Sequence, residues 1–308
     1  MYGRIFGLKR FEIHDGDGIR STLFLKGCPL ACKWCHNPEG MQYKACLGYV
    51  EAKCINCGEC VAVCPNGAQS IGIKNDNVPY HIFKRDKCLG CGLCEKVCLG
   101  RALTLYGRDV SCEEILPRLL EDRDFYFASG GGVTLSGGEP AMQAEFSSEI
   151  LKSLKSFGIH TAIDTCGYAP LNAYEKMLPY TDLVLYDLKA ASSSVHEICT
   201  GKSNKMILDN LSWIDKANIP IDIRIPLIPG WNDNELEPMT KILLGIKNLR
   251  KTKVLPYHSF GIAKYSALEM EYPIPNTQEP ERETVIKAVK TLRTHGINAT
   301  DETGETYT

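Results

Sequence analysis

A chain of 308 residues with 44% hydrophobic and 23% charged side chains is long enough to bury one large core and to carry a small second domain. Its formal net charge of −2 excludes the basic composition of proteins that bind nucleic acid or anionic membranes through charge alone. Residues 1–10 lack the apolar run of a signal peptide, and no stretch approaches the roughly 18 apolar residues of a membrane span. We therefore expect a cytoplasmic monomer, with no nucleic acid and no membrane among its partners.

Residues 19–26, I-R-S-T-L-F-L-K, are β-branched and apolar with polar alternation, which is typical of a strand. The strand ends at Gly27-Cys28-Pro29, so we expect the first cysteines of the chain on the loop that follows it. Residues 45–105 differ in composition, because they are rich in Cys, Gly and Pro and contain one pattern twice. We interpret them as an inserted small domain whose fold depends on its metals, since their apolar content is too low for a core. The expected domains are therefore 1–44, 45–105 and 106–308.

Strands and helices alternate from residue 106 onward. Strands are expected at residues 133–135, 160–164, 183–187, 221–225 and 253–256. Helices are expected at residues 145–157, 171–177, 206–217, 237–246 and 282–294. This alternation predicts an α/β fold with a parallel sheet, whose chemistry lies at the carboxyl ends of the strands. The distinctive residues at those expected ends are Cys28, Glu139, Asp164, Asp187, Arg224 and His258.

Fifteen cysteines are the unusual feature of the composition. Twelve of them lie between Cys28 and Cys98, and eleven fall into three tight groups. In a chain of this length without a secretion signal, such grouping favours metal ligands over disulfides. The four cysteines outside the groups, of which only the first lies close enough to the insert to be tested as a ligand, are Cys46, Cys112, Cys166 and Cys199.

The first group has the spacing Cys28-x3-Cys32-x2-Cys35. Three thiolates can hold three irons of a [4Fe–4S] cube and leave the fourth iron open, as a catalytic metal centre requires. We predict that these cysteines are catalytic, and that the amino and carboxylate groups of S-adenosylmethionine (SAM) fill the open position. The alternative is a zinc loop with a distant fourth ligand such as His36, although zinc sites more often pair two C-x2-C knuckles.

Residues 28–40, C-P-L-A-C-K-W-C-H-N-P-E-G, resemble the radical SAM enzymes, and within them the activating enzymes of glycyl radical enzymes. The resemblance continues through H-D-G-D-G-I-R at 14–20, S-G-G-E-P at 136–140, D-T at 164–165, D-L-K at 187–189 and L-P-Y-H at 255–258. Asp17 departs from the family, which often has proline there. The resemblance covers residues 1–265 and implies a partial (β/α)6 TIM-like barrel with an inserted bacterial-ferredoxin-like domain.

The second and third groups each follow the C-x2-C-x2-C-x3-C spacing of bacterial ferredoxins, in which the fourth cysteine ligates the other cluster. We therefore assign one [4Fe–4S] cluster to Cys54, Cys57, Cys60 and Cys98. We assign the other, which is the third of the chain, to Cys64, Cys88, Cys91 and Cys94. In the second repeat Leu99 stands where the usual proline follows. Two separate zinc knuckles are the alternative.

The remaining motifs are candidates for SAM contacts. Gly137 and Gly138 let backbone approach a ligand, and with Glu139 they follow an expected strand directly. The resemblance implies that Lys189 contacts the SAM carboxylate, and that a monovalent cation binds near it through Asp164, Thr165 and Asp187. Further cofactor contacts are expected from Trp34, His36, Asn37, Arg224 and His258.

The resemblance implies an oxidoreductase that works under anaerobic conditions. A flavodoxin or ferredoxin supplies an electron, SAM is cleaved reductively, and the resulting radical takes hydrogen from one glycine of a partner glycyl radical enzyme. Two alternatives remain open at this stage. One is a radical SAM enzyme that acts on a small molecule or peptide. The other is a two-cluster electron carrier fused to a scaffold, which would leave the three-cysteine site without a function.

Overall fold

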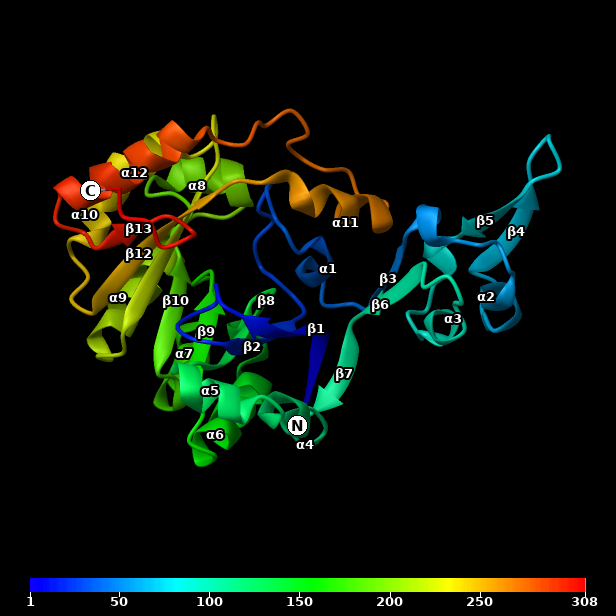
Figure 1. Cartoon of the computed structure of the whole chain (residues 1–308), viewed down its shortest axis with the longest axis horizontal. Coiled ribbons are helices and arrows are strands. Elements are labelled where there is room, and N and C mark those ends of the chain that lie inside the picture. Colours follow the sequence, from blue (N-terminus) through cyan, green and yellow to red (C-terminus); the bar gives the residue numbers. More distant parts are fainter. Residues whose placement is uncertain (308) are drawn as a thin grey trace.

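The computed structural model describes residues 1–307, and within them one nine-stranded sheet forms the body of the protein (Figure 1). Its strands, in sheet order, are β13 (Ala299–Thr300), β12 (Leu249–Pro256), β11 (Ile221–Leu227), β10 (Leu183–Asp187), β9 (His160–Thr165), β8 (Gly132–Gly137), β2 (Arg20–Leu25), β1 (Tyr2–Glu12) and β7 (Arg108–Ser111). The strands from β13 to β2 run parallel, and only β1 and β7 at one edge run antiparallel to their neighbours. The predicted α/β fold with a parallel sheet is thus confirmed.

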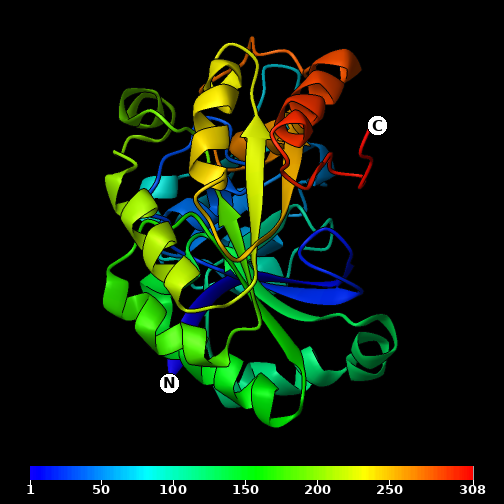
Figure 2. The same ribbon diagram turned by 90° about the vertical axis from the view of Figure 1, so that its left-hand side faces the viewer.

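Helices between the parallel strands cover the outer face of the sheet, as Figure 2 shows. The helices of the body are α1 (Pro38–Met41), α4 (Cys112–Leu120), α5 (Arg123–Ser129), α6 (Ala144–Ser156), α7 (Leu171–Met177), α8 (Ser193–Thr200), α9 (Lys205–Lys216), α10 (Leu236–Leu243), α11 (Ile262–Ala267) and α12 (Arg282–Thr294). Apolar residues at helical spacing turn one side of each longer helix inward, as Phe146, Ile150 and Leu154 do in α6. Each such buried side chain contributes about 1.5–3 kcal/mol of hydrophobic free energy.

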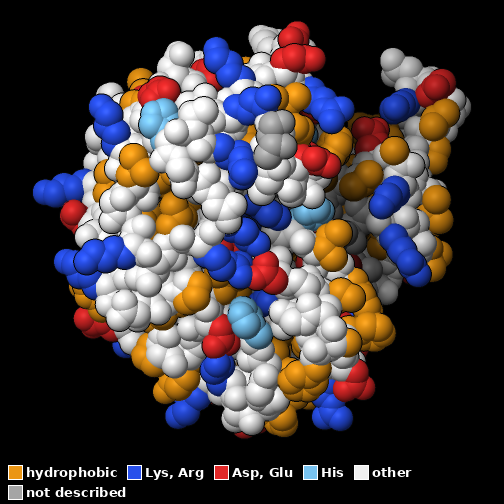
Figure 3. All heavy atoms as spheres, turned by 60° about the vertical axis from the view of Figure 1, so that its left-hand side comes forward, with side chains coloured by type: hydrophobic (Ala, Val, Ile, Leu, Met, Phe, Trp, Pro, Cys, Tyr) orange, Lys and Arg blue, Asp and Glu red, His pale blue; other side chains and the backbone are white. Residues whose placement is uncertain are grey.

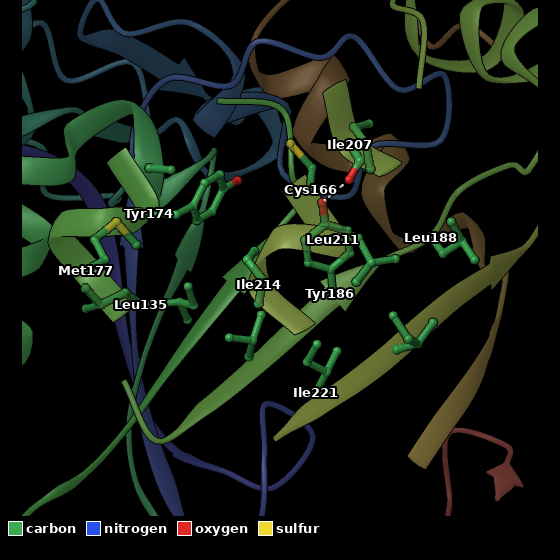
Figure 4. Close-up of a cluster of buried hydrophobic side chains, with 14 of the residues drawn as sticks. Leu135, Cys166, Tyr174, Met177, Tyr186, Leu188, Ile207, Leu211, Ile214 and Ile221 are labelled. Carbon is green, nitrogen blue, oxygen red and sulfur yellow. Dashed lines mark hydrogen bonds between the residues drawn. The ribbon is translucent and has the colours of Figure 1, made fainter. Parts of the chain in front are cut away.

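The core lies between the sheet and these helices. Figure 4 shows the part that is formed by side chains of β8, β10, α7 and α9. Tyr186 of β10 points toward α9, and its hydroxyl donates to the carbonyl of Ile207 at 2.6 Å. The turn after β9 packs directly on this ring. A Cβ at Gly167, where φ is +76°, would meet the Tyr186 hydroxyl at 1.8 Å, so only glycine fits there. This contact fixes the turn that carries Thr165 and Cys166.

Residues 46–106 project from the body as a separate unit on the right of Figure 1. It consists of two two-stranded sheets and two short helices: β3 (Cys46–Tyr49) with β6 (Leu103–Tyr106), β4 (Gln69–Ile73) with β5 (Pro79–Phe83), α2 (Glu59–Ala62) and α3 (Leu93–Lys96). Gly58 and Gly92 precede the two helices with φ of +80° and +75°, so each cysteine repeat turns through the same left-handed position. Arg85 joins the unit to α11, because its Nη2 donates to the Ala267 carbonyl at 2.7 Å.

Each strand predicted after residue 106, and the strand predicted at 19–26, is present within a few residues of its expected ends. The helix predicted at 237–246 ends at Leu243, because Gly245 lies just beyond and disfavours helix. The elements of the body that were not predicted are the strands β1, β7 and β13 and the helices α1, α4, α5, α8 and α11. No helix among residues 1–307 is both long and apolar enough to span a bilayer. On the face drawn in Figure 3, basic and acidic side chains are interspersed.

Candidate active site

A cavity of about 810 Å³ opens at the carboxyl ends of the parallel strands. Its volume lies in the range of small-molecule sites, and its wall combines apolar and charged side chains. All three cysteines of the first group line it. The predicted site residues that also line it are Trp34, His36, Asn37, Gly137, Gly138, Asp164, Thr165, Asp187, Lys189, Arg224 and His258. The structure therefore brings nearly all of the candidate residues to one place.

Backbone hydrogen bonds fix the cysteine loop that follows β2. The amide of Cys28 donates to the carbonyl of Met41 at 2.8 Å, and those of Ala31 and Lys33 donate to carbonyls at the end of α8. Burial raises the pKa of Cys32 and raises that of Cys35 to about 12, so both are neutral thiols without a metal. Metal binding at this loop must therefore release protons.

Three carboxylates converge on Arg224, which lies in the middle of β11. Its guanidinium nitrogens lie 3.3 Å from Asp15, 3.4 Å from Asp164 and 3.3 Å from Asp187. Lys189 donates to the second oxygen of Asp187 at 2.7 Å. Burial opposes ionisation of Asp187, but Lys189 and Arg224 outweigh it and lower the pKa of this carboxyl. Burial instead raises the pKa of Asp164 to about 7 against the lowering effect of Arg224.

Polar atoms of the cavity wall that are buried without a hydrogen-bond partner in the described part of the chain include Asp164 Oδ1 and His258 Nδ1. An unpaired buried polar atom costs about 1–3 kcal/mol, so these atoms fit a polar ligand that supplies the missing bonds. The ammonium and ribose hydroxyl groups of SAM match these unpaired atoms, and the positive charges of Lys189 and Arg224 in the same wall match its carboxylate. The residues present therefore fit SAM beside a three-thiolate cluster site.

The loop residues near the cysteines have definite contacts. Trp34 is buried and packs in a cluster with Tyr257 and Tyr265. His36 stacks on His258 with ring centroids 3.9 Å apart, and burial lowers the pKa of His36 to about 4. The ring is therefore neutral near pH 7, which suits a site for a cationic ligand.

Two further loop contacts bear on the SAM and zinc interpretations. The amide oxygen of Asn37 accepts from Lys264 at 2.8 Å. His36 Nε2 lies 3.1 Å from the His258 carbonyl oxygen, so this ring nitrogen is engaged outside the cysteine group.

The two glycines of the S-G-G-E-P motif make the β8 end fit against the cysteine loop. A Cβ at Gly138 would meet the Gly27 carbonyl oxygen at 2.3 Å, and one at Gly137 would meet the Leu25 nitrogen at 2.5 Å. Gly137 also has φ of +108°, in the left-handed region. Both glycines line the cavity, so this close approach forms part of its wall.

Glu139 differs from its expected role as a cofactor contact, because its side chain points into the protein. Its carboxylate accepts from the amides of Ala141 at 3.0 Å and Cys166 at 2.8 Å, and from the Thr165 hydroxyl at 2.8 Å. The side chain is fully buried, and it is absent from the cavity wall in the described structure. The Glu139 side chain thus holds the turn after β9, and the contact with a cofactor that was expected of this motif is left to its backbone.

The three residues expected to bind a monovalent cation do not form an open oxygen cage. The hydroxyl of Thr165 is bonded to Glu139 and Tyr174. The guanidinium of Arg224 lies between the carboxylates of Asp164 and Asp187. In this arrangement an arginine supplies the positive charge that the cation was expected to bring.

The cysteines of the inserted unit line two smaller cavities among the described residues. One is walled by Cys64, Cys88, Cys91 and Cys94, together with Leu47 and Gln69. The other is walled by Cys54, Cys57, Cys60 and Cys98, together with Tyr49 and His81. Each cavity thus combines three cysteines of one repeat with the last cysteine of the other.

Three polar residues in or beside the cavity were not among the candidates. Asp15 bonds to Arg224, Ser136 donates to Asp164 at 2.6 Å, and Lys264 contacts Asn37. Asp15 and Ser136 lie in the motifs at residues 14–20 and 136–140, so the motifs already pointed to these two residues. Lys264 carried none, because its place depends on α11 packing near the cysteine loop.

The family described as the Radical SAM superfamily matches residues 22–243, which include the cysteine loop and most of the parallel sheet. The chain belongs to the radical SAM superfamily. Relatives that match over nearly the whole chain narrow the assignment within this superfamily. The choline trimethylamine-lyase activating enzyme of Oleidesulfovibrio alaskensis is 42% identical over 275 residues, covering 88% of each chain. The trans-4-hydroxy-L-proline dehydratase activating enzyme of Clostridioides difficile is 40% identical, covering 96% of this chain and 97% of its own.

A third radical SAM relative, the isethionate sulfite-lyase activating enzyme of Desulfovibrio desulfuricans, is 38% identical and covers 88% of each chain. All three relatives are activating enzymes that match nearly end to end. The chain is therefore a radical SAM activating enzyme, which cleaves SAM and generates the radical of a glycyl radical enzyme. The family and function predicted from the motifs are confirmed.

Proposed function

We propose that this activating enzyme binds SAM in the cavity at the carboxyl ends of the parallel strands, over a [4Fe–4S] cluster held by Cys28, Cys32 and Cys35. The observation that carries the proposal is the shared wall: these three thiols line the same cavity as the unpartnered atoms of Asp164 and His258 and the positive charges of Lys189 and Arg224. When bound, the cluster and SAM supply the reductive chemistry that protein side chains lack.

The residues of this chain have the task of binding and orienting SAM and excluding water. Lys189 and Arg224 carry positive charge at the cavity wall, and we propose that they receive the SAM carboxylate. The neutral ring of His36 and the indole of Trp34 are proposed to contact the adenine and ribose, with Asn37 beside them. Gly137 and Gly138 offer backbone to the SAM ammonium. Glu139 acts as a positioning residue through the turn after β9.

A monovalent cation near the SAM carboxylate stays a prediction from the resemblance. Its expected ligands are Asp164, Thr165 and Asp187. A cation at this place must displace the guanidinium of Arg224 from between the two carboxylates. We propose that Arg224 makes the cation dispensable.

The six parallel strands β2 and β8 to β12 are proposed to form a partial (β/α)6 barrel around this cavity. The unit at 45–105 is proposed to be a ferredoxin-like domain with two further [4Fe–4S] clusters, so that the domains are 1–44, 45–105 and 106–308. Two cavities that each combine four cysteines in the crossed pattern of bacterial ferredoxins support this assignment. Two zinc ions in separate knuckles would leave the crossing unexplained.

We propose an order for electron transfer through the insert. Leu47 and Tyr49 lie on β3, which leads outward from the body, and they line the two cavities in turn. Gly90, in the wall of the cavity that Cys64, Cys88, Cys91 and Cys94 share, lies next to Ala45 at the base of the unit. This site is therefore proposed as the inner relay, and the Cys54, Cys57, Cys60 and Cys98 site as the outer one that receives an electron from a flavodoxin or ferredoxin.

The partner is proposed to be a glycyl radical enzyme of the lyase or dehydratase kind, because the relatives named above activate such enzymes. We propose that the chain works in the cytoplasm, since eleven ligand cysteines need a reducing compartment. That it works there as a monomer stays a prediction.

Anaerobic reconstitution tests the proposed SAM and cluster site. With dithionite and SAM, the protein should form 5′-deoxyadenosine, and Cys35→Ala should abolish it whereas Cys112→Ala, buried away from the cavity wall, should not. With a panel of lyases and dehydratases, electron spin resonance should show a glycyl doublet for the correct partner. Formation of 5′-deoxyadenosine without a doublet from any member would favour a small-molecule or peptide substrate. Equal activity of Cys35→Ala would overturn the cluster assignment.

A further inference from the structure

Two side chains of the β4–β5 hairpin, Gln69 and His81, lie between the two cysteine-lined cavities of the insert. Gln69 is in the wall of the cavity with Cys94, and His81 is in the wall of the other. Both are buried, with 3% and 8% of their surface exposed. The register pairs Gln69 with Phe83 and Ile71 with His81, so Gln69 and His81 are diagonal neighbours on one face of the hairpin.

A short chain of hydrogen bonds runs from His81 through Gln69 to a cluster cysteine. The ring Nε2 of His81 lies 2.6 Å from Gln69 Oε1, and Gln69 Nε2 donates to Cys94 Sγ at 3.7 Å. A thiolate can only accept, so the amide nitrogen faces Cys94 and the amide oxygen faces the ring. His81 must therefore carry its proton on Nε2. Burial lowers the pKa of His81, which keeps the ring neutral near pH 7.

The other ring nitrogen of His81 points to an incomplete site. His81 Nδ1 is buried and has no hydrogen-bond partner in residues 1–307, although its ring forms part of a cavity wall. The ring of Tyr49 packs against it with centroids 4.5 Å apart and limits its rotation. The His81 ring is thus linked through Nε2 and Gln69 to the cavity that contains Cys94. The same ring forms part of the wall of the other cavity.

Gln69 differs from the other donors to the insert cysteines. For the eight cysteines that line the two cavities, the remaining N–H bonds to sulfur in the described chain come from backbone amides, for example Ala68 to Cys64 at 3.1 Å and Ala102 to Cys98 at 3.2 Å. A hydrogen bond to a ligating sulfur stabilises negative charge, and reduction adds negative charge to a cluster. Such bonds therefore raise the reduction potential. Because Gln69 is a side chain held by another side chain, this donor depends on His81.

We propose that Gln69 and His81 form a hydrogen-bonded link between the two cluster sites, in which His81 orients the Gln69 amide and that amide raises the potential of the cluster that Cys94 ligates. The inference rests on the proposed function, which places two clusters in the insert. Because His81 also borders the outer site, a change at His81 reaches both clusters, whereas a change at Gln69 acts on the inner one. The two residues are positioning residues for electron transfer.

The test uses full-length protein in which Cys28, Cys32 and Cys35 are replaced by Ala, so that signals from the insert are read alone. Iron and sulfide analysis first counts its clusters. Redox titration followed by electron spin resonance then gives both midpoint potentials. Gln69→Leu should make reduction of the inner cluster about tenfold less favourable, which is a fall of about 59 mV for one electron. His81→Phe should lower the same potential and also shift that of the outer cluster, while His81→Gln, which keeps an N–H toward Gln69, should restore the inner value.

Tyr80→Phe is the matched control, because Tyr80 precedes His81 on the opposite face of the hairpin and is partly exposed. It should leave both potentials unchanged. The proposed link would be overturned if the protein holds two clusters whose midpoint potentials are the same with the wild-type insert, with Gln69→Leu and with His81→Phe. Fewer than two four-iron clusters in the parent protein would overturn the proposed function instead, so the two failures are distinguishable.

Discussion

Asp15 and Arg224 are 209 residues apart in the chain, and Asp15 Oδ1 accepts from Arg224 Nη1 at 3.3 Å at the wall of the cavity. The other carboxylate oxygen of Asp15 accepts from the Thr22 hydroxyl at 2.8 Å, and its carbonyl accepts from Thr134 at 2.7 Å. Asp15 is therefore fixed by β2 and β8 and in turn holds the guanidinium of Arg224 in β11. The first loop of the chain thus sets the position of a charge expected to contact SAM.

Replacing Asp15 by Asn should weaken SAM binding about tenfold, which corresponds to about 1.4 kcal/mol. Arg224 would lose one of its three carboxylate contacts and would be less well oriented toward the ligand. Equilibrium binding of SAM to the reconstituted protein measures the effect. Asp209→Asn, on the exposed side of α9, removes a carboxylate at a remote place and serves as control. Wild-type affinity in Asp15→Asn would show that Arg224 is held well enough by Asp164 and Asp187 alone.

The substitution Glu139→Gln should lower the free energy of unfolding by about 1–3 kcal/mol. The buried carboxylate accepts bonds from the Ala141 and Cys166 amides and the Thr165 hydroxyl, and a glutamine would turn an NH₂ group toward one of these donors. Urea unfolding under anaerobic conditions measures the loss. Glu145→Gln, in an exposed pair with Lys176, should change stability by less than half as much. Equal effects of the two substitutions would contradict the positioning role of Glu139.

The cavity could be predicted well from the sequence wherever a motif ends a strand. Cys28 and Asp187 come at or just after the end of runs of β-branched and apolar residues, and parallel strands bring their carboxyl ends to one edge. Arg224 also reaches the cavity, although β11 continues beyond it to Leu227. The direction of each side chain could not be predicted in the same way. Glu139 looks like its neighbours in sequence, yet it turns inward because two amides and a hydroxyl meet it there.

The parts that were missed depend on contacts far apart in the chain. β1 was not predicted, because glycines at 3 and 7 and charged residues at 9 and 10 interrupt its apolar alternation. It forms because β2 and β7 pair with it on both sides. The link between Gln69 and His81 was also invisible, since it depends on the register of a hairpin and not on the spacing of the cysteines.

Cleavage of SAM should not depend on which monovalent cation is present. Arg224 lies between Asp164 and Asp187, and the Thr165 hydroxyl is bonded elsewhere, so the positive charge at this place is part of the chain. Rates of 5′-deoxyadenosine formation in sodium, potassium and tetramethylammonium buffers of equal ionic strength should agree within twofold. Arg224→Gln should be slower and should gain a dependence on sodium or potassium. A wild-type rate that collapses in tetramethylammonium would instead favour the cation that the family resemblance implies.

Asp17, where the family often has proline, should contribute stability that disappears in acid. Burial opposes its ionisation, but Arg250 and Lys251 outweigh this and lower the pKa of Asp17 to about 2. Because the folded pKa lies below the unfolded value of about 3.9, the contribution is complete above about pH 4 and is lost as the pH falls toward 2.

With 45% of the Asp17 side chain exposed, solvent screening limits the contribution to about 0.5–1 kcal/mol. Urea unfolding of wild type and Asp17→Asn in parallel should show this difference at pH 7 and a smaller one at pH 3. A difference that grows on acidification would contradict the assignment.

Replacing Cys57 or Cys91 by Ala tests whether the insert carries electrons to the active site. Both thiols are exposed, and each lines one of the two cysteine cavities of the insert, so each substitution should damage one cluster with little effect on the body. If the insert is the route, glycyl radical formation driven by flavodoxin should fall at least tenfold in both variants. With dithionite, a small reductant that reaches the first cluster directly, 5′-deoxyadenosine formation should be nearly unchanged. Full flavodoxin-driven activity in correctly folded variants would reject an obligate path, because electrons would then enter at the Cys28 loop without passing through the insert.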